Sequence, residues 1–447
     1  MKRAQRGGRA AQPAGKPAHG RRDRPKPHDP RDPRSAKDRK RDPRDPRGAK
    51  DRKRGHHPGG PRPEHKAQRG QHPSGPRTDQ KAQQPPSPVD PEKLAHALST
   101  KSQAPLRVGE WLWTTREGAE RDLIEELLWS GDKAIRPRLL GPALVASAKA
   151  PQLRDGRLDL TFARQGFQVS SLVRVDSSIA DAPRALAEEL LPSLKSATDG
   201  AEQHALHVFV ADSTAGNPLS ARAQAIRDML EAQCPHTLDE SQLRRQSGLL
   251  AQICVVDAQT AALGCMPSDQ AQSPWPGGRA RMRLGGSFPS RAARKLAEAF
   301  AWLGLAPGSG ELCVDLGAAP GGWSWLLLEK RARVIAVDPA RMDAELMRNP
   351  RLRHVQGNAF EYEPEEPVDW LFCDMAYRPL EVAQMLGRWA RRRHTRLLVS
   401  NFKLPMKRKV EMVERIRGLL ADSGFTGLRT RQLYHDREEI TLTAHVR

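Results

Sequence analysis

The carboxy-terminal third of the chain alternates between short apolar segments and longer segments in which apolar residues recur at helical spacing. This pattern predicts strands at 312–316, 333–338, 368–375, 396–404 and 439–446, and helices at 291–302, 322–331, 379–393 and 407–423. Strands rich in Val, Ile and Leu that alternate with helices are typical of an open, mostly parallel, doubly wound α/β sheet. In such sheets, ligands bind at the carboxyl ends of the strands.

Residues 106 to about 266 show shorter alternations of the same kind. The predicted strands are 110–115, 207–212 and 249–258, and the predicted helices are 117–129, 182–196 and 220–233. Nothing in this part has the spacing of catalytic residues, so it is predicted to form small α+β or α/β modules for binding or scaffolding. A Pro/Gly-rich linker at 273–291 follows, carrying Arg279, Arg281, Arg283 and Arg291, and marks the last domain boundary.

The positive charge of the chain is concentrated near its beginning. Residues 1–92 hold 26 Lys and Arg residues against 11 Asp and Glu residues, a surplus of 15 within a formal net charge of +21. A 13-residue unit occurs twice in tandem there, as DPRDPRSAKDRKR at 29–41 and DPRDPRGAKDRKR at 42–54. Few of these residues can be buried and prolines interrupt any helix, so the segment is predicted to be disordered. It is either a solvated tail without a specific role or a tether to a polyanion, and nucleic acid is the favoured polyanion because no lipid-facing stretch or myristoylation signal occurs.

The sequence predicts neither a membrane span nor a signal peptide, because no apolar run is long enough and Met1 is followed by polar residues. We therefore expect a cytoplasmic protein that does not associate with membranes. The number of cysteines is odd and none forms a Cys-x-x-Cys pair, which argues against a disulfide framework and a zinc ribbon. The five are Cys234, Cys254, Cys265, Cys313 and Cys373.

The segment VDLGAAPGGWSWLLLEK at 314–330 places a glycine-rich turn between a predicted strand and a predicted helix. Its spacing matches neither the dinucleotide fingerprint nor a P-loop, so a diphosphate ligand is disfavoured. Gly317, Gly321 and Gly322 permit close backbone approach, and the following helix N-terminus suits a carboxylate. The next strand ends in Asp338, whose carboxylate can accept hydrogen bonds from both ribose hydroxyls. A carboxylate and an adenosine ribose without phosphate indicate S-adenosylmethionine, although a plain strand-to-helix connection with Asp338 as a helix cap would have the same pattern.

Four charged residues accompany this loop. Lys295 lies in the helix before the first strand of the sheet, Asp374 and Lys403 end two further strands, and Glu439 begins the last one. Each has a plain structural explanation by itself, as a solvated charge or a helix cap. Because strand ends of a doubly wound sheet lie close to the cofactor loop, the set as a whole favours a catalytic site.

The motifs SRAARKL, DLGAAPGGW, CDM, NFKLPMK and LYHDREEITLTAHVR resemble the ribosomal RNA large subunit methyltransferase M family, the cytidine 2'-O-ribose methyltransferases of bacterial 23S ribosomal RNA. They also resemble the Lys-Asp-Lys-Glu set of the wider FtsJ-like class of heat-shock-induced ribose methyltransferases. The similarity is strong over about 286–447 and weak over 106–270. It implies a basic tail at 1–105 outside the family, a ferredoxin-like module at 106–198, a THUMP RNA-binding module at 199–272, a linker at 273–289 and a Rossmann-like methyltransferase domain at 290–447.

The resemblance also implies roles for individual residues. Lys295, Asp374, Lys403 and Glu439 take the places of the catalytic tetrad, with Lys403 as the proton acceptor and Glu438 as the alternative to Glu439. Cofactor contacts fall on Ser290, on Ala319, Pro320, Gly321 and Gly322 of the loop, on Asp338 and on Asp374. The family usually has an aspartate where this chain has Asn358, whose carbonyl can still accept a hydrogen bond from the adenine amino group. The implied partner is 23S ribosomal RNA before full subunit assembly, and we expect a monomer.

The chemistry of ribose methylation is consistent with this set. A ribose hydroxyl is a poor nucleophile until its proton is accepted, and an ordinary lysine is protonated at neutral pH. We therefore expect the pKa of Lys403 to be lowered by burial, by Lys295 and by the sulfonium charge of the cofactor. Asp374 and Glu439 act in the opposite direction and are assigned to orienting the lysines and the hydroxyl. The remaining work is alignment of the oxygen with the methyl carbon, and no metal is required.

Three other functions stay open from the sequence. A base methyltransferase would use the same cofactor, but no Asn-Pro-Pro-Tyr segment occurs and packing explains Cys373 better than nucleophilic attack. A non-catalytic RNA-binding protein with a degenerate methyltransferase domain is disfavoured by the complete tetrad. A protein methyltransferase fits poorly with the basic tail and the Arg-rich linker.

Overall fold

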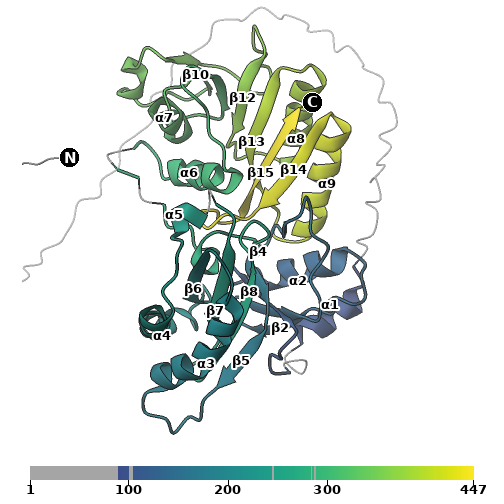
Figure 1. Cartoon of the computed structure of the whole chain (residues 1–447). Helices are drawn as coiled ribbons and strands as arrows, with labels where there is room; N and C mark the ends of the chain where they lie inside the picture. The colour runs from purple at the N-terminus through teal and green to yellow at the C-terminus, as the bar shows by residue number, and fades with distance from the viewer. Residues whose placement is uncertain (1–88, 100–103, 244–245, 283, 286–287, 447) are drawn as a thin grey trace, which may run out of the picture. The chain divides into compact units, whose positions relative to one another are not determined.

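A computed structural model of the chain describes residues 89–99, 104–243, 246–282, 284–285 and 288–446 (Figure 1). These residues all belong to one unit, which spans Ala82–Arg447. The two basic repeats at 29–54, with the predictions made for residues 1–88, lie outside the described residues.

The carboxy-terminal part of the chain forms a seven-stranded sheet with the strand order β11–β10–β9–β12–β13–β15–β14 (Figure 1). The first five strands in this order are parallel to their neighbours, whereas β15 is antiparallel to both β13 and β14. The predicted mostly parallel, doubly wound sheet is therefore confirmed. Its strands are β9 (Leu312–Leu316), β10 (Arg333–Val337), β11 (Leu352–Val355), β12 (Val368–Cys373), β13 (Thr395–Lys403), β14 (Phe425–Arg431) and β15 (Glu439–Val446).

Helices cover both faces of this sheet. The pair α6 (Ala292–Leu303) and α7 (Gly322–Glu329) packs on one face, and α8 (Pro379–Arg391) and α9 (Lys409–Asp422) pack on the other (Figure 1). In β12, Trp370 and Phe372 join the core beneath α6 and α7, while Leu371 joins the core beneath α8 and α9. Because side chains of a strand alternate between faces, burial on both faces requires the continuous apolar run that the sequence shows.

Two four-stranded sheets precede this domain. The first has the order β2–β3–β1–β4 and is antiparallel throughout; the second has the order β5–β8–β7–β6, with only the β6–β7 pair parallel. Their α+β character agrees with the sequence, and their assignment as ferredoxin-like and THUMP modules stays a prediction. The strands are β1 (Trp111–Thr115), β2 (Arg138–Gly141), β3 (Leu144–Ser147), β4 (Ala163–Gln168), β5 (Ser171–Arg174), β6 (His204–Val210), β7 (Leu249–Val255) and β8 (Thr260–Pro267).

The helices of this part pack against the two small sheets. They are α1 (Pro91–Leu98), α2 (Glu120–Trp129), α3 (Ala182–Thr198), α4 (Ser220–Gln233) and α5 (Glu240–Leu243). Single 3₁₀ turns occur at Asn217–Leu219, Pro276–Gly278 and Leu346–Arg348.

Two predicted limits need correction. The ordered part of the chain was expected to begin near Leu106, yet α1 lies upstream of it, with Leu94 and Ala97 buried against the rest of the fold. Asp90 caps this helix by accepting a hydrogen bond from the Glu92 backbone N–H at 2.9 Å, a local signal that the basic composition obscured. The predicted boundary between residues 198 and 199 also falls inside one unit, because β5 pairs with β8 and α3 packs on that sheet.

Among the described residues, no helix combines the length and apolar character needed to cross a membrane. All five cysteines lie in this part of the chain and carry free thiols. Cys254, Cys313 and Cys373 are buried.

Candidate active site

The glycine-rich loop connects β9 to α7 at the carboxyl end of the sheet. Gly317 and Gly321 have φ angles of +77° and +120°, which side chains other than glycine rarely adopt. A Cβ atom at Gly317 would also lie 2.7 Å from Met375 Cγ, and one at Gly321 would collide with Leu346. The close approaches that these glycines permit are therefore made by the protein's own side chains. The Ala319–Pro320 peptide bond is cis.

Asp338 follows β10 and lies directly beside this loop. Its Oδ2 accepts a hydrogen bond from the Ala319 backbone N–H at 3.1 Å, and its Oδ1 accepts one from the Ala340 backbone N–H at 2.7 Å. The side chain is half-buried. Ser290 lies on the other side of the loop, where a Cβ atom at Gly322 would be 2.9 Å from the Ser290 Cβ. The structure thus brings Ser290, the loop and Asp338 together, as the motifs predict.

A third carboxylate lies beneath the loop. Asp315 in β9 is fully buried, and its Oδ2 accepts a hydrogen bond from Ser324 Oγ of α7 at 2.7 Å. Burial raises the pKa of Asp315 to about 7. Its Oδ1 has no hydrogen-bond partner among the described residues. With Asp338 and Asp374, this edge of the sheet is rich in acceptors and repels phosphate, so it fits the ammonium and ribose hydroxyl groups of S-adenosylmethionine.

Asn358 lies three residues after β11, at the same edge of the sheet as Asp338. Its Oδ1 accepts a hydrogen bond from the Phe360 backbone N–H at 3.0 Å, and its Nδ2 donates one to Glu361 at 2.8 Å. The side chain therefore stabilises a local turn. A carbonyl oxygen has two lone pairs, so contact with adenine stays a prediction.

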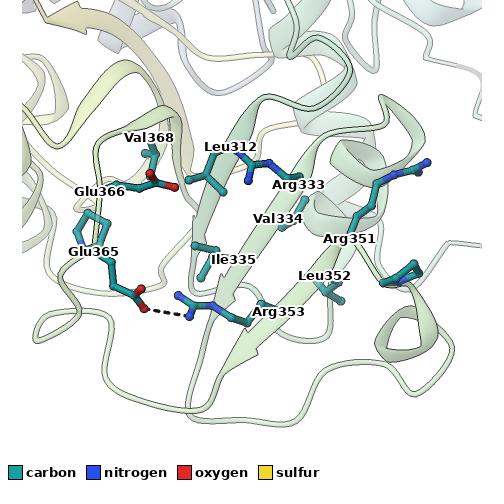
Figure 2. A pocket seen from close by; sticks show the side chains of 12 residues that line it. Leu312, Arg333, Val334, Ile335, Arg351, Leu352, Arg353, Glu365, Glu366 and Val368 are labelled. Carbon is teal, nitrogen blue, oxygen red and sulfur yellow. Dashed lines mark hydrogen bonds and ion pairs between the residues drawn. The ribbon is translucent and has the colours of Figure 1, made fainter.

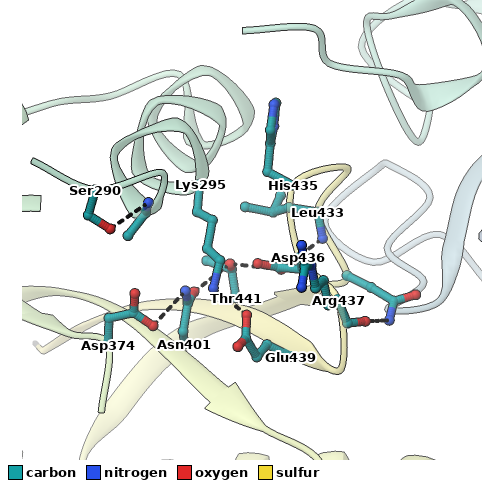
Figure 3. A network of polar contacts seen from close by, with 12 residues as sticks. Ser290, Lys295, Asp374, Asn401, Leu433, His435, Asp436, Arg437, Glu439 and Thr441 are labelled. Atoms are coloured by element: carbon teal, nitrogen blue, oxygen red, sulfur yellow. Dashed lines mark hydrogen bonds and ion pairs between the residues drawn. The ribbon is translucent and has the colours of Figure 1, made fainter. Parts of the chain in front are cut away.

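Three residues of the predicted tetrad, Lys295, Asp374 and Glu439, lie together at this edge of the sheet (Figure 3), and the fourth, Lys403, is the strand partner of Glu439. Lys295 of α6 forms an ion pair and hydrogen bond with Glu439 at the start of β15. Asp374 follows β12, and its Oδ1 accepts a hydrogen bond from Asn401 Nδ2 at 3.1 Å. Lys403 stands directly opposite Glu439 in the antiparallel β13–β15 ladder, so the two side chains leave the same face of the sheet.

The surroundings of Lys403 correct one expectation. Its side chain is exposed, whereas the sequence analysis expected it to be buried. Lys403 is the last residue of β13 and follows five buried residues of that strand. Lys295 is the lysine that the fold encloses, with 16% of its side chain exposed.

The structure distinguishes the two candidate glutamates. Glu438 forms ion pairs with Lys409 at 3.3 Å and with Arg116 at 3.5 Å, away from Lys295. Its neighbour Glu439 pairs with Lys295. Because successive side chains of a strand point to opposite faces, only one of the two can face the tetrad.

Charges of opposite sign balance at this site. Burial acts to lower the pKa of Lys295, but the carboxylates of Asp374 and Glu439 act to raise it, and the pKa lies above its ordinary value. Burial raises the pKa of Asp374, while Lys295 and the hydrogen bond from Asn401 act to lower it. Lys295 is therefore a fixed cation at neutral pH.

Several polar residues that the sequence did not predict support the tetrad. Asn401 and Thr441 are buried partners in the β13–β15 ladder, and the loop before β15 contributes the buried Asp436. Glu298 of α6 accepts hydrogen bonds from the backbone N–H groups of Tyr434 at 2.8 Å and His435 at 3.0 Å, which holds that loop against the helix. Polar residues inside otherwise apolar strands, as in LLVSNFK, are the signal that could have identified Asn401.

Two cavities lie near these elements. One, of about 610 Å³, is lined by Leu312, Arg333, Leu352 and Val368, the first residues of four strands (Figure 2). It therefore lies at the amino ends of the strands, opposite the cofactor loop, and is not the cofactor site.

The other cavity, of about 490 Å³, adjoins the tetrad through Asp436. Its walls include Arg116, Arg164, Tyr434 and Arg437. The Arg164 guanidinium lies over the Tyr434 ring, 5.0 Å from its centroid, and also pairs with Asp212. Arginine beside an aromatic ring is a combination that suits nucleotides.

Two observations bear on other chemistry. Burial raises the pKa of the Cys373 thiol to about 12, which disfavours the thiolate that nucleophilic attack requires. Across the described part of the chain, no cluster of three or more His, Cys, Asp or Glu side chains is arranged to hold a metal ion.

Comparisons with known proteins place this site in a family. Residues 288–399 match the family of FtsJ-like methyltransferases. The chain is 35% identical over 359 residues to the ribosomal RNA large subunit methyltransferase M of Alkalilimnicola ehrlichii, an alignment that covers 75% of this chain and 94% of that protein. It is 34% identical over 351 residues to the protein of the same name from Laribacter hongkongensis, covering 74% and 95% of the two chains.

Among solved structures, the fibrillarin pre-rRNA processing protein of Methanococcus jannaschii is similar at 16% identity and a TM-score of 0.29, covering 44% of this chain and 82% of that chain. The assignment rests on the two sequence relatives. They are 35% and 34% identical to this chain, and the alignments cover 94% and 95% of their own length. The chain belongs to the ribosomal RNA large subunit methyltransferase M family.

Proposed function

We propose that this protein transfers a methyl group to the 2'-oxygen of a cytidine in 23S ribosomal RNA. The observation that carries the proposal is the meeting of Lys295, Asp374, Lys403 and Glu439 beside the glycine-rich loop, in a chain of this methyltransferase family. The methyl donor is S-adenosylmethionine, which supplies an electrophilic methyl group when bound.

The carboxylate-rich loop edge holds this donor in the proposed arrangement. Asp338 binds the ribose hydroxyls, and the Ser290 side of the loop closes around the methionine portion. Asp374 is the tetrad residue that adjoins the loop, because its backbone N–H donates to the carbonyl of Leu316, the residue before the loop, at 3.2 Å. It therefore contacts both the donor and the reacting groups.

Lys403 accepts the proton of the ribose hydroxyl in this mechanism. Its exposed side chain reaches substrate from the end of β13, whereas Lys295 stays a cation paired with Glu439. An RNA backbone that covers Lys403 in the complex would remove water from this side chain. Asp374 and Glu439 orient the two lysines, and the fold aligns the oxygen with the methyl carbon.

The cavity beside the tetrad supports an RNA substrate. Arg116, Arg164 and Arg437 line it together with the acidic residues Glu117, Asp212 and Asp436, and Tyr434 offers an aromatic ring for stacking. Arginine contacts to phosphate position RNA, and stacking on aromatic side chains holds unpaired bases. We propose that the protein acts on this RNA in the cytoplasm as a monomer before full subunit assembly.

The alternative of a base methyltransferase that attacks through Cys373 finds no support in this site, because the thiol is buried and its pKa is raised. The alternative of a degenerate, non-catalytic domain is disfavoured by the Lys295–Glu439 ion pair. A domain that no longer catalyses a reaction does not need these two partly buried charges.

Ribose methylation mapped across the ribosomal RNA of a strain that lacks this protein tests the proposal. We expect one cytidine of 23S RNA to lose its 2'-O-methyl group and to regain it when the wild-type gene is restored. Restoration with the Lys403→Ala variant is the matched control and should leave that cytidine unmethylated. An unchanged ribose methylation pattern, or loss of a base methyl group instead, would contradict the proposal.

A further inference from the structure

A half-buried carboxyl group, Asp374, and a fully buried one, Asp436, are connected at the active site by a chain of hydrogen bonds (Figure 3). Asn401 Nδ2 bonds to Asp374 Oδ1 at 3.1 Å, Asn401 Oδ1 bonds to Thr441 Oγ1 at 2.7 Å, and Thr441 Oγ1 lies 3.2 Å from Asp436 Oδ2. Asn401 and Thr441 face each other in the β13–β15 ladder, so the backbone fixes the middle of the chain. Both side chains are buried.

The donors and acceptors along this chain restrict its protons. A carboxamide has a donor end and an acceptor end, and a hydroxyl has a single proton to donate. If Asn401 donates to Asp374, its oxygen must accept from Thr441, and Thr441 then has no proton left for Asp436. All three contacts of the chain are hydrogen bonds only when one of the two carboxyl groups, Asp374 or Asp436, accepts a hydrogen bond and the other donates one. A carboxyl donates only in its protonated form.

We propose that Asp374 and Asp436 share a single proton through Asn401 and Thr441, with Asp436 protonated, so that Asp436 is a positioning residue for the ionised Asp374. This inference rests on the proposed function only for the importance of Asp374. The count of donors and acceptors stands independently of the reaction.

The surroundings of the two carboxyls favour the proton on Asp436. Its Oδ1 is buried without a hydrogen-bond partner in the described structure, which would leave a charged oxygen unpaired if the group were ionised. Two other carboxylates, Glu298 and Glu439, favour its protonated form, against the cation Lys295 and the Leu433 backbone N–H, which donates to Asp436 Oδ2 at 3.0 Å. Burial raises the pKa of Asp436 well above its ordinary value, more than these contacts lower it.

Burial also raises the pKa of Asp374, but it is the pKa of Asp436 that is raised well above its ordinary value. The Lys295 ammonium and the Asn401 amide both favour its ionised form, and Glu439, the opposing carboxylate, is itself paired with Lys295. With Asp436 protonated, Thr441 must donate to the Asn401 oxygen, which keeps the Asn401 amide nitrogen directed at Asp374. The chain therefore holds the Asp374 carboxylate in one orientation beside Lys295.

Infrared spectroscopy of the full chain labelled with ¹³C-aspartate tests the position of the proton without requiring turnover. At pH 7, we expect Asp436→Asn to remove one carbonyl band of a protonated aspartate, and Asp374→Asn to leave that band in place. Thr443→Val is the matched control, because its buried hydroxyl lies in the same strand but has no hydrogen-bond partner in the described structure. Any band from Asp315 is common to all variants and cancels in the differences. Persistence of the band in Asp436→Asn, or its loss in Asp374→Asn alone, would overturn the proposal.

Kinetics test whether the chain matters for positioning. We expect Thr441→Val to slow single-turnover methyl transfer on the order of 10- to 100-fold with little change in cofactor affinity, since small misplacements at a reacting centre cost this much. Thr443→Val should stay near the wild-type rate. In the double variant, Asp436→Asn should add no further loss to Thr441→Val, because the chain is already cut. If the rate losses of Thr441→Val and Asp436→Asn multiplied in the double variant, and all variants had the same melting temperature, Asp436 would act by a route other than this hydrogen-bond chain. If the protein had another activity, the infrared measurement would still test the position of the proton, whereas the methyl-transfer kinetics would fail because of the proposed function and not because of the hydrogen-bond chain.

Discussion

Lys295 and Lys403 carry the same ammonium group in opposite surroundings. Lys295 is enclosed between α6 and β15 and paired with Glu439, and nearby carboxylates raise its pKa although burial acts to lower it. Lys403 is exposed at the end of β13. A proton acceptor must exchange its proton with substrate, so the enclosed cation suits an electrostatic role and the exposed lysine suits the role of base.

The role of Lys403 can be tested by two replacements. We expect Lys403→Ala to reduce methyl transfer by about 10²–10⁴-fold, the usual contribution of general-base catalysis, while cofactor and RNA binding stay nearly intact. Lys403→Arg should fail as well, because a guanidinium does not lose its proton in proteins. The measurement is single-turnover transfer to ribosomal RNA, with cofactor affinity measured in parallel and the exposed neighbour Lys407→Ala as control. Near-normal turnover in Lys403→Arg would leave the residue an electrostatic role at most.

Asp338 provides a second prediction at this scale. Asp338→Ala should weaken S-adenosylmethionine binding by removing two ribose hydrogen bonds to a charged acceptor, each worth about 1.5–3 kcal/mol. It should also loosen the loop, because Asp338 Oδ2 accepts a hydrogen bond from the Ala319 backbone N–H. Calorimetric titration measures the change. Asp369→Asn, a change at the amino end of β12, is the control at the opposite edge of the sheet. Equal affinities of wild type and Asp338→Ala would place the cofactor elsewhere.

At the scale of elements, burial decided which strands of the seven-stranded sheet the sequence could predict. Strands β9, β10, β12, β13 and β15 are covered by helices or by neighbouring strands, and their apolar runs identified them. The edge strands β11 and β14 were missed. Strand β14, with the sequence FTGLRTR, contains Gly427 at a φ of +59° and a register shift between Thr426 and Arg429, so it has neither an apolar run nor a clean alternation.

The same reasoning explains which site residues were found. Asp374, Lys403 and Glu439 stand at strand ends, where a change from apolar to charged residues is visible in the sequence. The exposure of Lys403 could not be predicted, because it depends on where the covering helices stop. Asp436 and Glu298 were invisible because their contacts join α6 to a loop more than a hundred residues later in the chain.

Asp315 connects β9 to α7 through Ser324, and its titration gives a prediction for stability. Its pKa is about 7 in the fold against an ordinary value of 3.8, because burial favours the protonated form. The contribution of this group to stability is therefore complete below about pH 4 and is lost as the pH rises to 7. Asn at position 315 does not titrate. The free energy of unfolding of Asp315→Asn should therefore rise relative to that of wild type by up to about 4 kcal/mol between pH 4 and pH 7, and the difference should stay constant above pH 7.

Urea denaturation of both proteins between pH 4 and pH 8 measures this difference. Asp199→Asn, at an exposed position after α3, is the control and should show no comparable pH trend. A difference between wild type and Asp315→Asn that stays constant over the range would mean that Asp315 titrates normally in the fold.

At the scale of the whole molecule, the methyltransferase sheet is joined to the preceding small sheets by buried polar contacts. Arg431 of β14 donates a hydrogen bond to the Arg164 carbonyl at 2.9 Å, and burial lowers its pKa to about 10. The Thr161 and Thr430 hydroxyls are 2.8 Å apart, and Lys409 bonds to Asp122 at 2.9 Å. Buried charges are costly to leave unpaired, so these contacts favour one relative placement of the sheets.

We predict that the basic segment at 1–88 adds to the affinity for RNA. It carries 26 Lys and Arg residues against 9 Asp and Glu residues, without an aromatic residue for stacking, so its contacts should be to phosphate. Removal should stop at residue 88 because Leu94 and Ala97 of α1 are buried in the fold. We expect this truncation to weaken binding of cognate and unrelated RNA by the same factor and to flatten the dependence of affinity on salt. A full-length variant with Gln in place of every Lys and Arg at 29–54 keeps the length of the tail and should reproduce part of the loss. Filter-binding titrations over a range of salt concentrations measure both effects, and a loss confined to the cognate RNA would show that the tail reads sequence or shape instead.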